Sequence, residues 1–205
     1  MRKNYWVWLI LWLITAAAQC AMVGQKAPDF TGKDTWGKTH QLSDYKGKFV
    51  VLEWHNHDCP FTLSQYQGKM QKLQQTWTKR GVVWLRVISS APGKDGYVDA
   101  QRANLDASRN GAAATATLLD PTGVIGHAYG AKTTPHMFII GTDGILLYNG
   151  AVDNAPLEDA FSDKTQKGEI YVNYVDQALW ETTSNREISV KSTAPYGCAV
   201  KYKEP

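Results

Sequence analysis

The sequence predicts a single α/β domain whose central mixed sheet carries helices on both faces. Two nearly continuous apolar runs, 49–55 and 82–88, are typical of strands that are buried on both sides. A helical pattern separates them, and a hairpin signal and a further helix follow. About 185 residues follow an N-terminal export signal, which is enough for one domain with its own core.

Turn-forming glycines and prolines, and the spacing of apolar residues, predict the first elements. Glycines and prolines break residues 24–48 into short strands, of which 39–42 is one. Pro60 is well placed as the first residue of a helix. Apolar residues then recur at helical spacing up to Trp77, and Gly81 ends the helix, while Gly68 weakens it.

The later elements complete the layout. We expect a weaker helix over 98–109, a short strand over 115–119 and a helical turn over 124–129. Strands over 136–140 and 145–148 flank the hairpin signal Gly141-Thr142-Asp143-Gly144, and a last helix covers 170–182. This order predicts a thioredoxin-like fold with an N-terminal extension, an insert between the second and third core strands, and an irregular C-terminal tail.

The N-terminal segment predicts export. Arg2 and Lys3 precede an apolar stretch over 5–14 and the small residues 16–18, which is the pattern of a secretory signal peptide. We therefore divide the chain into a signal peptide (1–20), a thioredoxin-like domain (21–184) and a tail that carries Cys198 (185–205), and we expect a bacterial periplasmic protein. An uncleaved membrane anchor and a lipid-modified Cys20 stay open, although Gln19 before that cysteine argues against the lipid.

Composition limits the possible partners. The formal net charge is +3 and falls to +1 without Arg2 and Lys3, so no electrostatic footprint for nucleic acid is present. The eight Trp and ten Tyr are interpreted as packing residues. No motif indicates a cofactor. In an oxidising compartment, Cys59 and Cys198 suit one functional pair, or one nucleophile and a bystander.

Cys59 is the main candidate for chemistry. It follows a buried strand and precedes Pro60, so backbone N–H groups at the helix start would stabilise its thiolate, the nucleophilic form. A protonated His57 would add to this effect and Asp58 would oppose it. The alternative is a buried, inert cysteine.

Glu53 lies inside an otherwise apolar strand. A buried carboxyl has a raised pKa and can transfer a proton near neutrality. The alternative interpretation is a Glu that faces a polar loop or pairs with Lys132.

An alternating pattern also indicates a metal site as an alternative. Glu53, His55, His57 and Cys59 would share one face if the strand continued, and His136 would add a copper or zinc ligand. The strand is expected to break near residue 56, so the favoured prediction contains no metal.

Several segments in order resemble the redoxin branch of the thioredoxin superfamily, the alkyl hydroperoxide reductase/thiol-specific antioxidant group. The early ones are 27–30, 42–48 and 51–54 ahead of Cys59-Pro60-Phe61. The segments 89–94, 132–138, 148–151 and 195–198 resemble its bacterial peroxiredoxin-like subgroup more narrowly. The match covers nearly the whole chain after the signal segment.

The resemblance assigns roles by position. Cys59 falls at the first cysteine of a thioredoxin Cys-x-x-Cys, and Thr62 occupies the second. Peroxiredoxins place Thr first and the peroxidatic cysteine three residues later, so the order here is reversed, which argues against ordinary peroxidase activity. Thr134-Pro135 matches the cis-proline step, and Glu53 matches the buried acid that thioredoxin uses as a proton acceptor.

These roles lead to a functional prediction. Cys59 attacks a disulfide or an oxidised sulfur of a protein or small molecule, Pro60, Phe61, Thr134 and Pro135 contact the substrate, and Glu53 and Thr62 assist. Cys198 is a resolving thiol, a permanent structural bridge or a free thiol. A bridge to Cys59 would close a loop of about 140 residues and stabilise the fold by roughly 4–5 kcal/mol in the chain-entropy model. The alternatives are a thiol-dependent peroxidase with antioxidant function, and a copper- or zinc-binding accessory protein.

Overall fold

The computed structural model describes residues 21–155 and 170–203. The predicted signal peptide, with Cys20, lies outside these residues. Within the described part of the chain no helix is long and apolar enough to cross a membrane.

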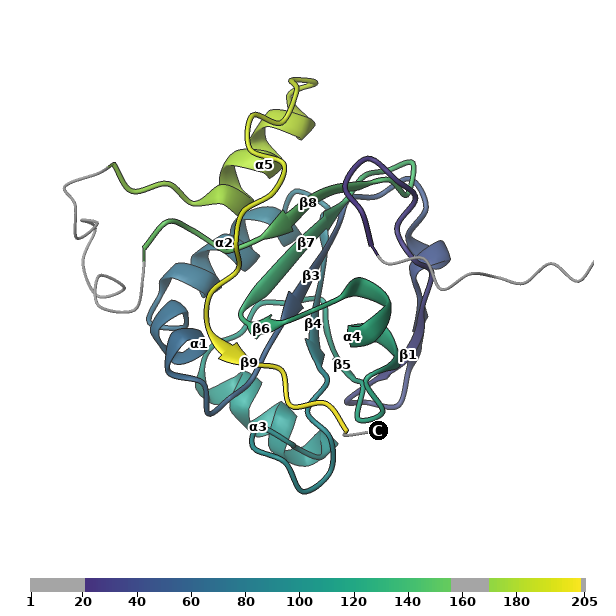
Figure 1. The fold of residues 1–205 in the computed structure, drawn as a ribbon, viewed down its shortest axis with the longest axis vertical. Helices are drawn as coiled ribbons and strands as arrows, with labels where there is room; N and C mark the ends of the chain where they lie inside the picture. Colours follow the sequence, from purple (N-terminus) through teal and green to yellow (C-terminus); the bar gives the residue numbers. More distant parts are fainter. Residues whose placement is uncertain (1–20, 156–169, 204–205) are drawn as a thin grey trace, which may run out of the picture.

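A seven-stranded sheet forms the centre of the molecule (Figure 1). Strands β3, β4 and β5 are parallel, and every other neighbouring pair is antiparallel. In spatial order the strands are β2 (Thr39–Gln41), β1 (Thr31–Asp34), β5 (Ala116–Leu119), β4 (Val83–Ile88), β3 (Val50–Trp54), β7 (His136–Ile140) and β8 (Leu146–Gly150).

A second, two-stranded sheet joins distant parts of the chain. Strand β6 (Thr133–Thr134) pairs antiparallel with β9 (Cys198–Ala199), so that Thr134 lies opposite Cys198. The tail is therefore irregular apart from β9. Figure 1 shows β9, in yellow, beside β6 at one end of the large sheet.

Helices cover both faces of the sheet, as the sequence predicts. On one face, Leu52 and Trp54 of β3 pack with Ile125 and Tyr129 of α4. On the other face, Val51 packs with residues of α2 and α5. The helices are η1 (Leu42–Tyr45, a 3-10 turn), α1 (Pro60–Gln65), α2 (Lys69–Thr78), α3 (Ala100–Arg109), α4 (Val124–Tyr129) and α5 (Tyr174–Thr183).

The single helix predicted after Pro60 is two helices. The first helix ends at Gln65, and Gly68, with a φ of 112° that residues with a Cβ rarely adopt, is the N-cap of the second. The break separates the short α1, which carries the segment after Cys59, from α2, which packs on the sheet.

Candidate active site

Cys59 lies at the junction between β3 and α1, as the sequence predicts. It is the N-cap residue of α1, and Pro60 is the first helical residue. The preceding turn is held by Asn56, whose carbonyl oxygen accepts the Cys59 N–H at 3.2 Å and whose side-chain oxygen accepts the Asp58 N–H at 2.9 Å. This turn fixes the sulfur at the carboxyl edge of the sheet.

The Cys59 sulfur lies between the Thr134-Pro135 loop and the tail. The thiol donates to the carbonyl oxygen of Thr134 at 2.9 Å, and the backbone N–H of Cys198 donates to the sulfur at 3.4 Å. Cys59 is 1% exposed, yet it belongs to neither of the two large apolar clusters of the core. The sulfur is thus covered by the tail, a peripheral segment, and both cysteines are free thiols.

The two thiols differ in acidity. Burial opposes ionisation of Cys59, but hydrogen bonds from Cys198, from the Thr134 side chain and from the Thr62 N–H outweigh it and lower the pKa of Cys59. Burial, the hydrogen bond to Cys59 and the charge of Cys59 raise the pKa of Cys198 to about 12. Cys59 therefore ionises first, and Cys198 retains its proton while Cys59 is a thiolate.

The residues beside Cys59 in α1 take different positions. Pro60 is exposed, and Phe61 packs against Tyr196 with ring centroids 5.9 Å apart. Thr62 is 1% exposed, and its hydroxyl has no hydrogen-bond partner. The backbone N–H of Thr62 nevertheless helps to lower the pKa of Cys59.

The Thr134-Pro135 peptide bond is cis, which confirms the prediction for this step. Thr134 is buried, and its carbonyl oxygen faces the Cys59 thiol. His136, the next residue, holds the loop, because its Nδ1 accepts the Lys132 N–H at 3.1 Å and its Nε2 hydrogen-bonds the side-chain oxygen of Asn149 at 2.7 Å.

The pKa of Glu53 is lowered, so the predicted raised pKa is wrong. Burial favours the neutral acid, but His55, the Arg86 guanidinium and the Tyr66 hydroxyl together stabilise the carboxylate more strongly. Three donors reach the carboxylate from within the fold: the Tyr66 hydroxyl at 2.7 Å, the Gln74 amide at 2.8 Å and the Trp84 indole at 2.7 Å. These groups, and not Lys132, are its hydrogen-bond partners.

The alternating histidines do not converge. His55 Nε2 lies 3.0 Å from Asp106, His57 Nε2 lies 3.2 Å from Asp58, and His136 contacts Lys132 and Asn149. Among the described residues no group of three or more His, Cys, Asp or Glu side chains could hold a metal ion. The structure thus lends no support to a copper or zinc centre.

The structure adds a polar anchor for the tail that the sequence does not predict. The hydroxyl of Tyr196 donates to the buried Asp153, and the Gln65 amide donates to both, at 2.9 Å to Asp153 and 3.1 Å to Tyr196. Of these three residues, only Tyr196 could be identified as a candidate from the sequence, because it stands two residues before Cys198. Nothing local marks Gln65 or Asp153.

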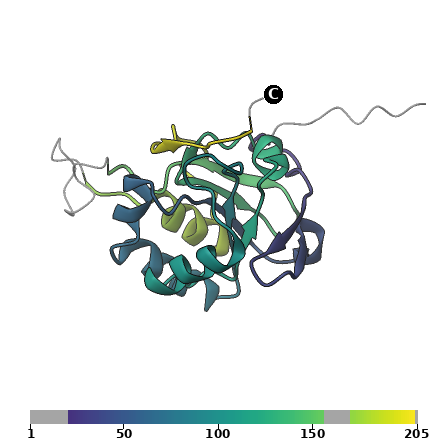
Figure 2. The same cartoon turned by 90° about the horizontal axis from the view of Figure 1, so that it is seen from below.

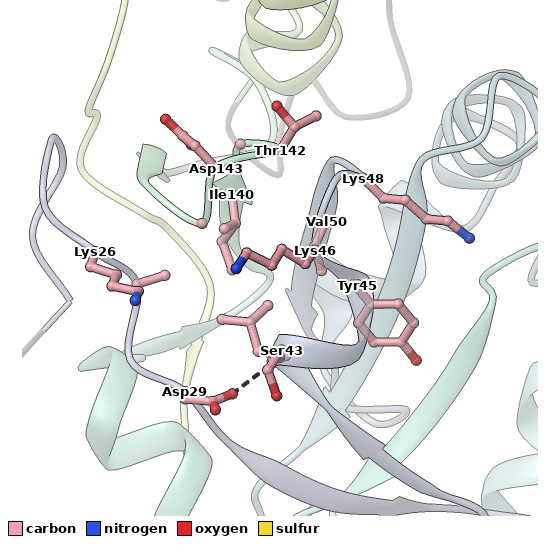
Figure 3. A pocket seen from close by; sticks show the side chains of 14 residues that line it. Lys26, Asp29, Ser43, Tyr45, Lys46, Lys48, Val50, Ile140, Thr142 and Asp143 are labelled. Carbon is pink, nitrogen blue, oxygen red and sulfur yellow. Dashed lines mark hydrogen bonds between the residues drawn. The ribbon is translucent and has the colours of Figure 1, made fainter.

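A separate pocket of about 210 Å³ lies at the opposite end of β3, beside Val50. Lys46 extends over it, Lys26 lies at its edge, and the Ser43 N–H donates to Asp29 at 3.3 Å (Figure 3). Its lining includes neither a cysteine nor a histidine. The thiol chemistry therefore belongs to the other end of the sheet.

The sheet order, with a thiol at the β3–α1 junction against a cis-proline loop, defines a thioredoxin-like protein. A hypothetical protein from Sinorhizobium meliloti 1021 superposes with a TM-score of 0.77 at 18% identity, covering 91% of this chain and 98% of its own. The thioredoxin domain of a thiol-disulfide oxidoreductase from Bacteroides vulgatus superposes with a TM-score of 0.50 at 18% identity, over 62% of this chain and 87% of its own. These likenesses show the fold.

Sequence comparison then gives the family. Residues 23–149 match the AhpC/TSA family, and the chain belongs to that family. Thiol-disulfide oxidoreductase ResA from Geobacillus thermodenitrificans is 30% identical over 122 residues, which are 60% of this chain. The match spans 65% of that relative, just under two thirds of its length.

Proposed function

We propose that this protein is an exported thiol-disulfide oxidoreductase in which Cys59 is the nucleophile and Cys198 is the resolving thiol. One observation carries the proposal: the backbone N–H of Cys198 lies 3.4 Å from the Cys59 sulfur, across 139 residues of chain. The similarity to ResA, a thiol-disulfide oxidoreductase, supports the same chemistry. Its substrates are protein or small-molecule disulfides.

The first step is attack by the Cys59 thiolate on a substrate disulfide. A new bond forms between the Cys59 sulfur and one substrate sulfur, the substrate S–S bond breaks, and the other substrate sulfur leaves and takes up a proton. The pKa of Cys59 is lowered while the tail covers it, and the hydrogen bonds from Thr134 and from the Thr62 N–H, which do not belong to the tail, also favour the thiolate that this step needs.

The second step is attack by Cys198 on Cys59. Once Cys59 is joined to the substrate it carries no charge, so two causes of the raised pKa of Cys198, the Cys59 charge and the hydrogen bond to it, disappear. Cys198 can then lose its proton, bond to the Cys59 sulfur and release the substrate cysteine as a thiol. The substrate has gained two electrons, and an external dithiol supplies two more to reduce the Cys59–Cys198 disulfide, becoming a disulfide itself. The same steps in reverse oxidise a substrate dithiol.

Mass spectrometry of the intact chain tests these steps. After reaction with oxidised glutathione, the C198S variant should carry one glutathione on Cys59, and the native chain should carry the 59–198 disulfide instead. C59S should yield neither product. A native chain that keeps glutathione on Cys59 would exclude Cys198 as the resolving thiol. The mass of the exported chain would also locate the signal cleavage and the fate of Cys20.

Membership of the AhpC/TSA family favours a peroxidase as the second candidate. The Cys59 thiolate would attack a hydroperoxide, the O–O bond would break, and an alcohol and Cys59 sulfenic acid would form. Cys198 would condense with the sulfenic acid and release water. Peroxide consumption that is lost in C59S would support this candidate, whereas consumption that persists in C59S would exclude Cys59 as the oxidised group.

A further inference from the structure

The tail segment 191–202, called the strap, is bound to the domain at several points along its length. Its first contacts are to β8 and the residue after it: the Thr193 N–H donates to the Asn149 carbonyl at 3.2 Å, and the Thr193 hydroxyl accepts the Ala151 N–H at 2.9 Å. Tyr202 closes the other end, with its ring stacked 4.1 Å from that of His127 in α4. Figure 1 shows the strap, in yellow, running from α5 past α1, and Figure 2 shows it from below along one side of the domain.

The strap adds a strand to the cis-proline loop. Thr134 pairs with Cys198 and Thr133 with Ala199, and the Val200 N–H donates to the Lys132 carbonyl at 2.9 Å. An extended peptide that binds by strand addition would use the same backbone edge. The strap also places a cysteine opposite Thr134, against the Cys59 sulfur, where a substrate cysteine must lie for exchange.

Two strap residues before Cys198 fit their positions closely. Gly197 has φ of 133°, and a Cβ at this position would overlap the carbonyl oxygen of Thr134, so no larger residue fits without a backbone shift. Tyr196 lies against Phe61, and its hydroxyl donates to Asp153, which is 1% exposed. An open pocket of about 340 Å³ borders Tyr196 and Phe61.

We propose that the strap occupies the substrate site as a built-in substrate mimic, and that the preferred substrate is an extended segment with glycine directly before its reactive cysteine and a tyrosine directly before the glycine. This inference rests on the proposed function, because it takes Cys59 as the nucleophile. The proposed function does not specify which substrate sequence is recognised, and this inference supplies that sequence. Phe61, Gln65 and Asp153 determine the preference for tyrosine, and the Thr134 carbonyl determines the preference for glycine.

Because the strap mimics the substrate, the strap and the substrate compete for the same site. Both need the Thr134 edge, so the strap leaves before a substrate binds and returns when Cys198 resolves the mixed disulfide. Return of the strap displaces the product from the backbone edge and brings the resolving thiol to Cys59 in the same movement.

Synthetic peptides test the recognition. The probe is a copy of residues 193–200 whose cysteine is joined to 5-thio-2-nitrobenzoate, and the partner is the full chain with C198S, which stops after one transfer. Release of the coloured thiolate measures the rate. Peptides with alanine in place of the tyrosine or of the glycine should react more slowly by about tenfold or more, because each loses a buried hydrogen bond to a charged group or gains a backbone clash.

The outcomes separate this inference from the proposed function. The mixed disulfide of glutathione with the same chromophore serves as a small control substrate. If neither the peptides nor the control reacts at Cys59, the proposed function fails. If the control reacts and all three peptides react at the same rate, the function stands and the substrate mimic is excluded.

Competition by the strap has its own test. The Y196F variant removes the hydroxyl that binds Asp153, and Y97F, at a residue that is 42% exposed and belongs neither to the strap nor to its anchor, is the matched control. The strap also stabilises the thiolate, so the rates are compared at high pH, where Cys59 is ionised in every chain. There, alkylation of Cys59 by iodoacetamide should be faster in Y196F than in the native chain and unchanged in Y97F. Equal rates in all three chains would mean that the strap does not limit access to Cys59.

Discussion

At the scale of single residues, Cys59 and Cys198 are two thiols of the same intrinsic chemistry with opposite shifts in pKa. Hydrogen-bond donors surround the Cys59 sulfur, and they lower its pKa in spite of burial. The Cys198 thiol is partly buried beside a sulfur that ionises first, so its pKa rises to about 12. The difference assigns the order in which the two sulfurs act.

Thr62 is predicted to assist ionisation of Cys59. Its hydroxyl is buried without a partner in the described structure, so it is free to donate to a thiolate. Thr62→Val should raise the pKa of Cys59 and slow its alkylation at neutral pH. The free energy of unfolding should not fall, because valine removes a buried group that has no hydrogen bond.

The pH profile of alkylation and a urea titration measure these two quantities. A profile identical to that of the native chain would restrict Thr62 to packing.

Glu53 is predicted to act on stability more than on chemistry. Glu53→Gln removes the charge that faces Arg86 and leaves three donors with a weaker acceptor, so it should destabilise the fold by roughly 3 kcal/mol. The exposed Glu187, which pairs with Lys191 at 2.8 Å, gives the matched control E187Q, with little expected change.

Urea unfolding and Cys59 alkylation distinguish the roles of Glu53. Loss of reactivity in E53Q at unchanged stability would instead place Glu53 in the proton path.

Local sequence could predict Cys59 and Thr134-Pro135, because a strand, a following proline and a Thr-Pro step are visible within a few residues. The pKa of Glu53 could not be predicted in this way. Its three donors stand 13, 21 and 31 residues further along the chain, and only the packed fold brings them to one carboxylate. Asp153 is hidden for the same reason, since its partner Tyr196 is 43 residues away.

At the scale of elements, the cis-proline loop depends on a histidine that is neutral. Burial lowers the pKa of His136 from 6.5 to about 4. The unfolded chain therefore takes up a proton before the folded chain does, and stability is lost as the pH falls from about 6.5 to 4. The expected loss is about 3 kcal/mol for this residue.

Unfolding free energies between pH 7 and pH 4 measure this loss, and His136→Gln should flatten the curve. Asp106 contributes little to this loss, because its stabilising effect declines only as the pH falls from its ordinary pKa of 3.8 towards about 2. An equal slope in the native and H136Q chains would contradict the prediction.

Hydrophobic periodicity and turn-forming residues predict the helices and strands wherever the pattern extends over many residues. The buried strands β3 and β4 and the hairpin of β7 and β8 lie close to their predicted bounds. Periodicity alone could not detect the break at Gly68, because the apolar spacing continues across it. Strand β9 has only two residues and no pattern of its own, so only its partner β6 defines it.

At the scale of the whole molecule, the fold brings together two parts of the site that are far apart in the sequence. Cys59 and the Cys198 N–H are separated by 139 residues. A disulfide between these cysteines would restrict the unfolded chain strongly and should raise the free energy of unfolding by about 4–5 kcal/mol in the chain-entropy model.

Comparison of the oxidised and reduced chains in guanidinium chloride measures this difference. The C198S variant should unfold at the same denaturant concentration with or without dithiothreitol. If the native chain also shows no difference, the two cysteines do not form a disulfide in the folded protein.

Because Gly197 lies so close to Thr134, a substitution at this position can help to turn the protein into a trap that holds its reaction partners covalently. Alanine at position 197 would hold the strap away from the loop, and serine at position 198 would remove the thiol that frees a captured molecule. A doubly substituted chain, G197A with C198S, would keep its reactive sulfur uncovered and retain each partner as a stable adduct. Two side chains thus decide whether this protein releases what it reacts with or keeps it for identification.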